Sequence, residues 1–309
     1  MTHLLLLGAG FSHNWGAPLA KAVNGSLLRD LHHDPVLERA LRDKPFENAL
    51  ADFFKAGSGG DERHQRLQAA VTALFDRINQ SLGKRPFEFS NDRANSVKDF
   101  LERFDAIFTL NQDLLFEIAY LPRFISLKWT AAEVPGMQAS YEQVRPTLDD
   151  PTKLTWRPNG QRTVRKRVQP YFKLHGSSSW KLETGDTVMI MGSAKASAID
   201  RFPVLQWYHE ELRRRLNQPG TKLMVIGYSF LDEHINQAVL DAYRAHGLQT
   251  YIVDPRGKDV LQPPGIDGAQ IKWRREIQDI KLIGETLTPL STVFGGDTFA
   301  HGELMRFFE

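Results

Sequence analysis

Five short, uninterrupted apolar runs constrain the fold of this 309-residue chain more than any other feature. They lie at residues 3–8, 104–111, 171–176, 222–229 and 249–255. Continuous rather than alternating hydrophobicity is typical of parallel strands that are buried on both faces. Residues 231–247 follow the fourth run with helical apolar spacing, and Gly247 is suited to end a helix. Strand, helix and strand in this order predict an α/β fold with a Rossmann-like, doubly wound parallel sheet.

The chain between the first two runs has helical rather than strand character. Residues 34–54 and 61–83 show helical apolar spacing, and a Gly-rich joint at 57–62 separates them. We therefore expect a main domain over residues 1–260 with a helical insertion at about 30–100. Residues 121–169 are rich in Pro, Thr and Arg, which favours an irregular lid or contact region. Residues 261–309 are expected to form a C-terminal extension that packs on the domain or on an oligomer partner.

The first apolar run leads directly into "GAGFSHNWG", residues 8–16. Glycines here allow the backbone to approach a phosphate, and a following helix offers unpaired N–H groups to it. The turn departs from the dinucleotide-binding fingerprint, because His13 stands where the third glycine belongs. The acidic residue at the expected spacing, Asp30, lies in a stretch that looks helical. A phosphate-binding loop and a merely structural tight turn both remain open at this point.

The other four runs also end in polar or small residues. Asn111 ends the second run, His175 and Gly176 end the third, Gly227 and Ser229 end the fourth, and Asp254 lies near the end of the fifth. Asp113 and Asp232 follow shortly after the second and the fourth run. Ligands of open α/β sheets bind at the carboxyl ends of the strands. The sequence therefore predicts a ligand site at this edge, with a functional role for His175 and a structural one for His234.

Four motifs, "GAGFS", "TLNQD", "KLHGS" and "GYSFLDEHIN", occur in this order. Together they resemble the sirtuin-like NAD-consuming domains, specifically the bacterial branch found in anti-phage defence systems. The resemblance extends from the first turn to Asp254 and implies that residues 1–260 form an NAD-binding catalytic domain. It implies that Asn111, Asp113 and His175 act at the nicotinamide ribose, with His175 as the catalytic base. The cofactor-binding residues implied by these motifs are Gly8, Ala9, Gly10, Phe11, Ser12, Gly16, Pro18, Gly176, Gly227, Ser229, Asp232 and Asp254.

Two departures from the sirtuin deacylases narrow the range of reactions that we expect. Those enzymes usually follow the catalytic histidine with a four-cysteine zinc module, and this chain contains no cysteine. The Phe-Arg pair of the deacylase loop is also missing after Pro18. We therefore expect no zinc and no other metal site, and NAD as a substrate that is hydrolysed to nicotinamide and ADP-ribose. Arg256 lies close enough to Asp254 to leave open whether NADP is accepted.

The resemblance also implies a biological setting. An NAD-depleting effector of anti-phage defence is toxic unless it is gated, so we expect a homo-oligomer and consider a HerA-type hexameric DNA-translocase ATPase as partner. The basic residues 162–167 are a candidate contact surface, and direct nucleic-acid binding is not expected at a net charge of +2. No apolar run is long enough to span a bilayer, which favours a cytoplasmic protein. Two alternatives remain: an NAD-dependent protein deacylase or ADP-ribosyltransferase, and a non-catalytic NAD or ADP-ribose sensor.

Overall fold

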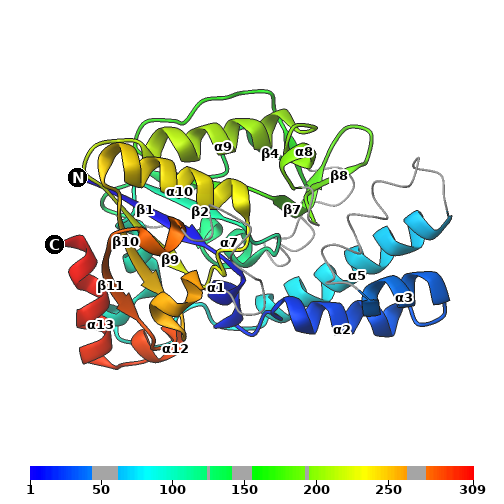
Figure 1. Cartoon of the computed structure of the whole chain (residues 1–309), viewed down its shortest axis with the longest axis horizontal. Coiled ribbons are helices and arrows are strands. Elements are labelled where there is room, and N and C mark those ends of the chain that lie inside the picture. The colour runs from blue at the N-terminus through cyan, green and yellow to red at the C-terminus, as the bar shows by residue number, and fades with distance from the viewer. Residues whose placement is uncertain (44–61, 124–125, 141–154, 192–194, 263–275) are drawn as a thin grey trace.

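A seven-stranded parallel sheet forms the centre of the protein in the computed structural model (Figure 1). The structure describes residues 1–43, 62–123, 126–140, 155–191, 195–262 and 276–309. The strand order is β11–β10–β9–β1–β2–β6–β3, and every neighbouring pair runs parallel. The predicted Rossmann-like α/β fold is confirmed.

The five apolar runs form the five central strands of this sheet. They are β1 (Thr2–Leu7), β2 (Ala106–Thr109), β6 (Val168–Lys173), β9 (Thr221–Ile226) and β10 (Gln249–Val253). Every residue of β2, β6 and β9 is buried, as continuous apolar runs predict. The outer strands, β3 (Ala131–Glu133) and β11 (Leu282–Thr286), are mostly half-buried or exposed. Because they lack a continuous apolar run, the sequence did not predict them.

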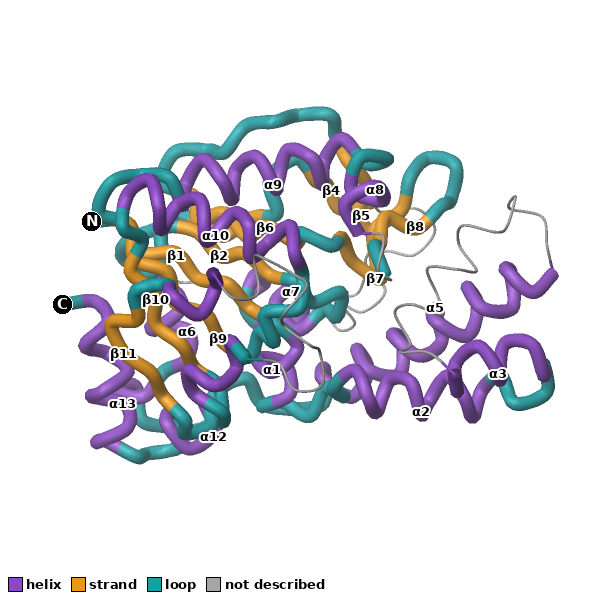
Figure 2. Tube along the Cα trace, in the orientation of Figure 1, coloured by secondary structure: helices purple, strands orange, loops and turns teal. Residues whose placement is uncertain are grey.

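Helices cover both faces of the sheet (Figure 2). On one face, α9 (Pro203–Leu216) packs beside α10 (Glu233–His246), and α10 ends as predicted at Gly247, which adopts a left-handed φ of 64°. The other face carries α1 (Ala9–His13), α6 (Val97–Glu102), α7 (Leu115–Ala119), α12 (Leu290–Val293) and α13 (Thr298–Met305). Short 3-10 helices lie at Arg93–Asn95, Leu121–Arg123, Gly257–Leu261, Ile277–Asp279 and Arg306–Phe308.

A second, four-stranded sheet lies beside the main one. It consists of β4 (Met137–Ser140), β5 (Thr155–Pro158), β7 (Gly176–Lys181) and β8 (Thr187–Met189), and α8 (Lys195–Ile199) follows it. One expectation is corrected here. The segment 121–169, expected to be irregular, carries β3, β4 and β5, although 124–125 and 141–154 lie outside the described residues. The serine run after His175 forms β7. The strands of this second sheet are short and rich in polar residues. Their positions therefore depend on pairing with neighbouring strands rather than on a hydrophobic pattern in the sequence.

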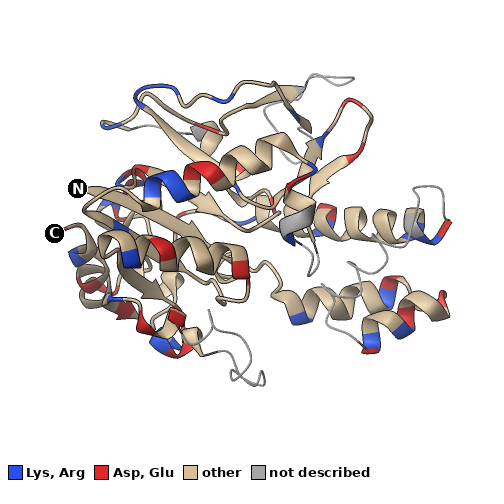
Figure 3. Ribbon diagram, turned by 45° about the horizontal axis from the view of Figure 1, so that its top comes forward, with Lys and Arg blue, Asp and Glu red and all other residues tan. Residues whose placement is uncertain are grey.

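The predicted helical insertion contains α2 (Ala20–Asp30), α3 (Pro35–Asp43) and α5 (Glu62–Gly83), which together project away from the sheet and are termed the helical arm (Figure 1). The predicted helix over 61–83 is confirmed by α5, whereas the end of the helix expected at 34–54 and most of the joint at 57–62 lie outside the described residues. Asp34 joins two arm helices, since its carboxylate caps α3 and pairs with Arg63 of α5 at 3.3 Å. Acidic and basic residues lie close together near the tip of the arm (Figure 3), where Arg42 pairs with Glu38 and Arg66 pairs with Glu62.

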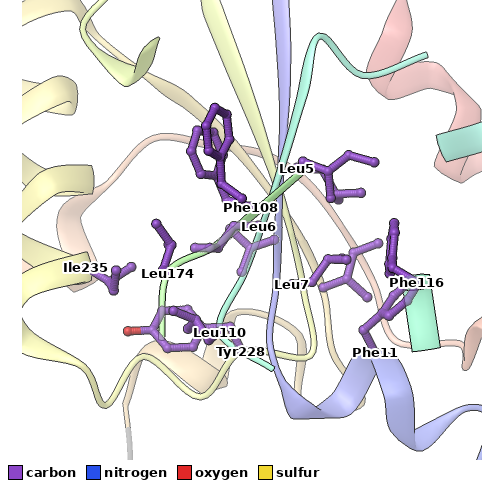
Figure 4. Packing of buried hydrophobic residues seen from close by; sticks show 14 of the residues in the cluster. Leu5, Leu6, Leu7, Phe11, Phe108, Leu110, Phe116, Leu174, Tyr228 and Ile235 are labelled. Atoms are coloured by element: carbon purple, nitrogen blue, oxygen red, sulfur yellow. The ribbon is translucent and has the colours of Figure 1, made fainter. Parts of the chain in front are cut away.

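The chain enters the sheet at its centre. From β1 it moves to β2 and β6 on one side, and it then returns to β9 and β10 on the other side. The order therefore reverses between β1 and β9, where open α/β sheets form their ligand crevice. Figure 4 shows that alternate leucines of β1 face opposite layers: Leu5 and Leu7 point toward Phe11 and Phe116, and Leu6 points to the opposite side. Both faces are thus packed right up to the crevice.

Candidate active site

A cavity of about 1080 Å³ opens at the carboxyl ends of the parallel strands. The turns after β1, β2, β6, β9 and β10 all contribute to its wall, and α2 and α5 of the helical arm close one side. The volume lies just above the range of about 300–1,000 Å³ that is usual for small-molecule sites. The predicted site residues that line this cavity are Gly8, Ala9, Gly10, Pro18, Asn111, Asp113, His175, Gly227, Ser229, Asp232 and Asp254.

Four predicted residues do not line the cavity but support its wall from behind. Phe11 packs against Trp15 and Phe116 with ring centroids 4.9 and 5.6 Å away, and Ser12 is buried beneath the first turn. Gly16 and Gly176 both have left-handed backbones, and a Cβ on Gly176 would lie 2.0 Å from the Val188 carbonyl oxygen. These two glycines are therefore required by the local backbone.

The first turn and the turn after β9 touch backbone to backbone. The Gly10 amide donates to the Gly227 carbonyl at 2.9 Å, and the Gly8 amide donates to the Ile226 carbonyl at 3.0 Å. A Cβ on Gly8 would lie 2.4 Å from the Gly227 oxygen. The sequence left open whether this turn is a phosphate-binding loop or only a tight structural turn. Its glycines are needed for a tight contact between two backbones, and the same contact forms the floor of the cavity.

A substitution at Gly227 tests this contact. Gly227→Ala places a Cβ 2.4 Å from the Cα of Gly10 and also forces a left-handed φ of 61° on alanine. The conformational cost of about 1–2 kcal/mol adds to an overpacking cost of about 1–3 kcal/mol. Gly247→Ala is the matched control, because its φ is 64° and no atom lies within 4 Å of the added Cβ. Urea unfolding should show a clearly larger loss for Gly227→Ala; equal losses would refute the steric argument.

Asn111 ties the end of β2 to the first turn. Its side-chain amide donates to the Gly8 carbonyl at 2.9 Å and to the Ser12 hydroxyl at 3.0 Å, and its own backbone amide donates to the Thr109 hydroxyl. Because both contacts use the amide nitrogen, the carboxamide oxygen remains to accept a hydrogen bond from a ligand hydroxyl or a water. Asn111 lines the cavity and is 8% exposed. Its geometry is therefore fixed before any ligand binds.

Asp113 lies at the end of the same loop, where hydrogen bonds to its carboxylate and to its backbone carbonyl hold it in place. Its carboxylate accepts from the amide of Leu115, the first residue of α7, at 3.1 Å. Its backbone carbonyl accepts from the buried ammonium of Lys173, which also pairs with Glu117 at 2.7 Å. Lys173 and Glu117 are almost completely buried. The loop that carries Asn111 and Asp113 thus rests on a buried ion pair.

His175 follows β6 and is 2% exposed. Burial lowers the pKa of its imidazole well below 6.5, and the nearby Lys195, His234 and His209 lower this pKa further. At neutral pH the ring is therefore uncharged and can accept a proton. Its Nε2 lies 3.2 Å from Nε2 of His234. The sequence interpretation treated His234 as structural, so this contact is a feature that the sequence did not reveal.

The turns after β9 and β10 also line the cavity. Asp254 accepts from the Arg256 amide at 2.9 Å and pairs with its guanidinium at 3.4 Å. Lys195 of α8 also lines the cavity and forms an ion pair with Asp232. Sequence reasoning missed Lys195, along with Phe75 and Ile78 of α5, which line the cavity from the arm. Only the three-dimensional fold brings these residues to the strand ends.

The described residues were also compared with what a metal site and a membrane-spanning helix require. Among the residues that the structure describes, no group of three or more His, Asp or Glu side chains is placed to hold a metal ion. No helix within the described ranges is long and apolar enough to cross a membrane.

The fold and the cavity define an α/β protein whose ligand site lies at the switch point of a parallel sheet. A family model for the SIR2-like domain matches residues 105–277, more than half of the chain, and the chain belongs to this family. The matched segment contains Asn111, His175, Gly227 and Asp254. SIR2-like domains bind NAD, which fits a large cavity lined by Gly8, Gly10 and Gly227. A comparison with curated proteins finds no match.

Proposed function

We propose that this protein is an NAD⁺ glycohydrolase that cleaves NAD⁺ to nicotinamide and ADP-ribose. The observation that carries the proposal is the placement of Asn111 and His175 on the wall of one cavity, with the Asn111 carboxamide held by Gly8 and Ser12. A neutral buried imidazole and a fixed carboxamide are the groups that activation of a water at a sugar carbon requires.

Hydrolysis of NAD⁺ requires few catalytic groups from the protein. Nicotinamide leaves NAD⁺ as a neutral molecule, so its ring nitrogen takes the bonding electron pair and needs no proton. Cleavage passes through an oxocarbenium-like ribose, as glycoside cleavage generally does. Water then forms the new bond to C1′ of the ribose and gives up one proton, for which His175 is the acceptor. Asn111 orients the water or a ribose hydroxyl through its carboxamide oxygen, and the cavity wall limits the access of other water.

The turns around the cavity support binding of both halves of the dinucleotide. The Gly8–Gly10 turn can face the pyrophosphate, since its glycines allow close approach of the backbone. Ser229 and Asp254 are proposed to hold the adenosine half, and Asp113 the nicotinamide ribose. Phe11, Gly16 and Gly176 act by shaping the loops that carry these contacts.

We also propose a biological role for this activity. An NAD-depleting effector of anti-phage defence requires gating, which we assign to homo-oligomer formation or to a HerA-type ATPase partner. The basic loop at 162–167 between β5 and β6 is the proposed contact surface, where Arg165 already pairs with Glu133. NAD⁺ is the proposed substrate, and no zinc is invoked, since the chain has no cysteine to form the deacylase module.

Product analysis tests the proposal. The full chain is incubated with NAD⁺, alone and with the candidate ATPase, and the products are separated by liquid chromatography. We expect equal amounts of nicotinamide and ADP-ribose without any peptide. Formation of O-acetyl-ADP-ribose only in the presence of an acetyl-lysine peptide would establish the deacylase alternative instead. Tight NAD⁺ binding with no product under any of these conditions would favour the sensor.

A further inference from the structure

The loop that carries Asn111 and Asp113 is held in part by a residue of the helical arm. Asn79 of α5 is 2% exposed and is the one buried polar residue among the side chains of α5 that the structure describes. Its carboxamide oxygen accepts from the Leu114 backbone amide at 2.9 Å, and its carboxamide nitrogen donates to the Ser178 hydroxyl at 3.2 Å. The rest of the buried face of this helix is apolar. A carboxamide is therefore stable there because of the groups that it bonds.

Asn79 and Ser178 hold the loop at two points. The Ser178 backbone amide donates to the Gln112 carbonyl at 3.1 Å, and Asn79 accepts from Leu114 two residues further along. The bond between Asn79 and the Ser178 hydroxyl joins these two contacts. Because a backbone amide can only donate, the oxygen of Asn79 must face Leu114, which sets the orientation of the carboxamide. The short segment with Asp113 at its centre is thus fixed at both ends.

Further bonds to this loop come from the central sheet. The Asn111 backbone amide donates to the hydroxyl of Thr109 in β2, and the Asp113 carbonyl accepts from Lys173 of β6. The bond from Asn79 adds a contact from the helical arm, which lies outside the sheet. The geometry of the loop therefore depends on how α5 packs against the main domain as well as on the sheet.

The helix that carries Asn79 also faces the ligand site. Phe75 and Ile78 of α5 line the cavity, and Asn79 directly follows Ile78 in the chain. A ligand that packs against these two side chains touches the same helix that holds the loop with Asn111. Ligand binding and the position of this loop are therefore linked through one helix.

We propose that Asn79 is a positioning residue, through which the helical arm holds Asn111 and Asp113 in the geometry that the reaction requires. This inference rests on the proposed hydrolysis of NAD⁺. Asn79 does not line the cavity and acts through the backbone of Leu114. Displacement of a catalytic group by about 1 Å can lower a rate about 100-fold, so a small shift of the loop is enough to impair hydrolysis.

Two alanine variants of α5 test the proposal through kinetics. Asn79→Ala removes both hydrogen bonds and is expected to lower kcat by as much as about 100-fold, with a much smaller change in KM, because the lining of the cavity stays intact. Leu67→Ala is the matched control. Leu67 is 1% exposed and lies about three turns away on the same helix, so this variant weakens the packing of the arm but keeps both bonds of Asn79. Its kcat should stay close to that of the wild type. Unchanged kcat in Asn79→Ala, or an equal loss in both variants, would overturn the proposal.

A conservative variant tests the hydrogen bond itself. Asn79→Asp keeps an oxygen that can accept from the Leu114 amide, and the Ser178 hydroxyl can donate to the second carboxylate oxygen. This variant should recover most of the kcat that Asn79→Ala loses. If its kcat is as low as that of Asn79→Ala, the bond to Leu114 does not position the loop.

Hydrogen exchange of the Leu114 amide provides a measurement without turnover. In the full chain this amide should exchange about tenfold faster in Asn79→Ala than in the wild type, as expected for the loss of one hydrogen bond, and it should keep its slow exchange in Leu67→Ala. If this pattern is found but the wild type consumes no NAD⁺, the hydrolase assignment fails and the contact between arm and loop stands. If NAD⁺ is hydrolysed but Asn79→Ala changes neither the exchange nor kcat, the positioning role is refuted and the hydrolase assignment stands.

Discussion

Replacement of His175 by alanine is expected to lower the rate of NAD⁺ hydrolysis by about 10²–10⁴-fold, the usual contribution of a general base. His175 is expected to matter this much because the lining of the cavity holds just one other histidine among the described residues, His13 at the end of α1. Binding of NAD⁺ should largely persist, because the glycine turns and the arm do not depend on this ring. Release of nicotinamide under saturating NAD⁺ measures the rate, and calorimetric titration measures the binding.

An exposed histidine provides the control. His246→Ala, at the end of α10, removes the same side chain far from the cavity and should leave the rate unchanged. The wild-type rate should also be insensitive to pH between 8 and 6, because burial holds the pKa of His175 well below 6.5. A base is lost only as pH falls through its own pKa, so the decline belongs at more acidic pH. Full activity in His175→Ala would remove the base from the proposed mechanism.

The central sheet could be predicted because burial on both faces leaves a direct mark on the sequence. Residues 4–7 of β1 and 223–226 of β9 are buried, and all of them are apolar. Edge strands and the second sheet carry no such mark. In β7 the serines are held by pairing with β8 and by the turn at Gly176, and a run of serines alone resembles a loop.

Part of the candidate site could also be predicted, because several of its residues lie at the ends of buried strands. Asn111, His175 and Asp254 directly follow predicted strands, so the sheet itself brings them to one edge. Lys195 and Phe75 lie on elements whose approach to the cavity depends on tertiary packing, and no local pattern marks them. The proximity of His234 to His175 needed coordinates, because their separation in sequence says nothing about the 3.2 Å contact.

The buried pair of Lys173 and Glu117 leads to the second large expected effect. Both side chains are at most 1% exposed, and the second carboxylate oxygen of Glu117 has no hydrogen-bond partner within the described structure. Lys173→Met would leave the Glu117 charge buried without compensation, which typically costs about 3–5 kcal/mol. Burial already raises the pKa of Glu117, and Lys173 counteracts that rise. The loss should therefore be greatest at neutral pH and should shrink on acidification, as Glu117 becomes protonated; urea unfolding at several pH values measures it.

A double variant separates stability from function. Lys173→Met with Glu117→Leu replaces the pair by apolar side chains of similar size, and such replacements are often neutral or stabilising. Most of the lost unfolding free energy should therefore return. The Asp113 carbonyl nevertheless loses the ammonium that it accepts from, so the loop bearing Asn111 loses its anchor. We expect the double variant to be stable but impaired in NAD⁺ hydrolysis, because the ion pair serves to position this loop. Full recovery of both properties would show that the pair contributes nothing specific to the site.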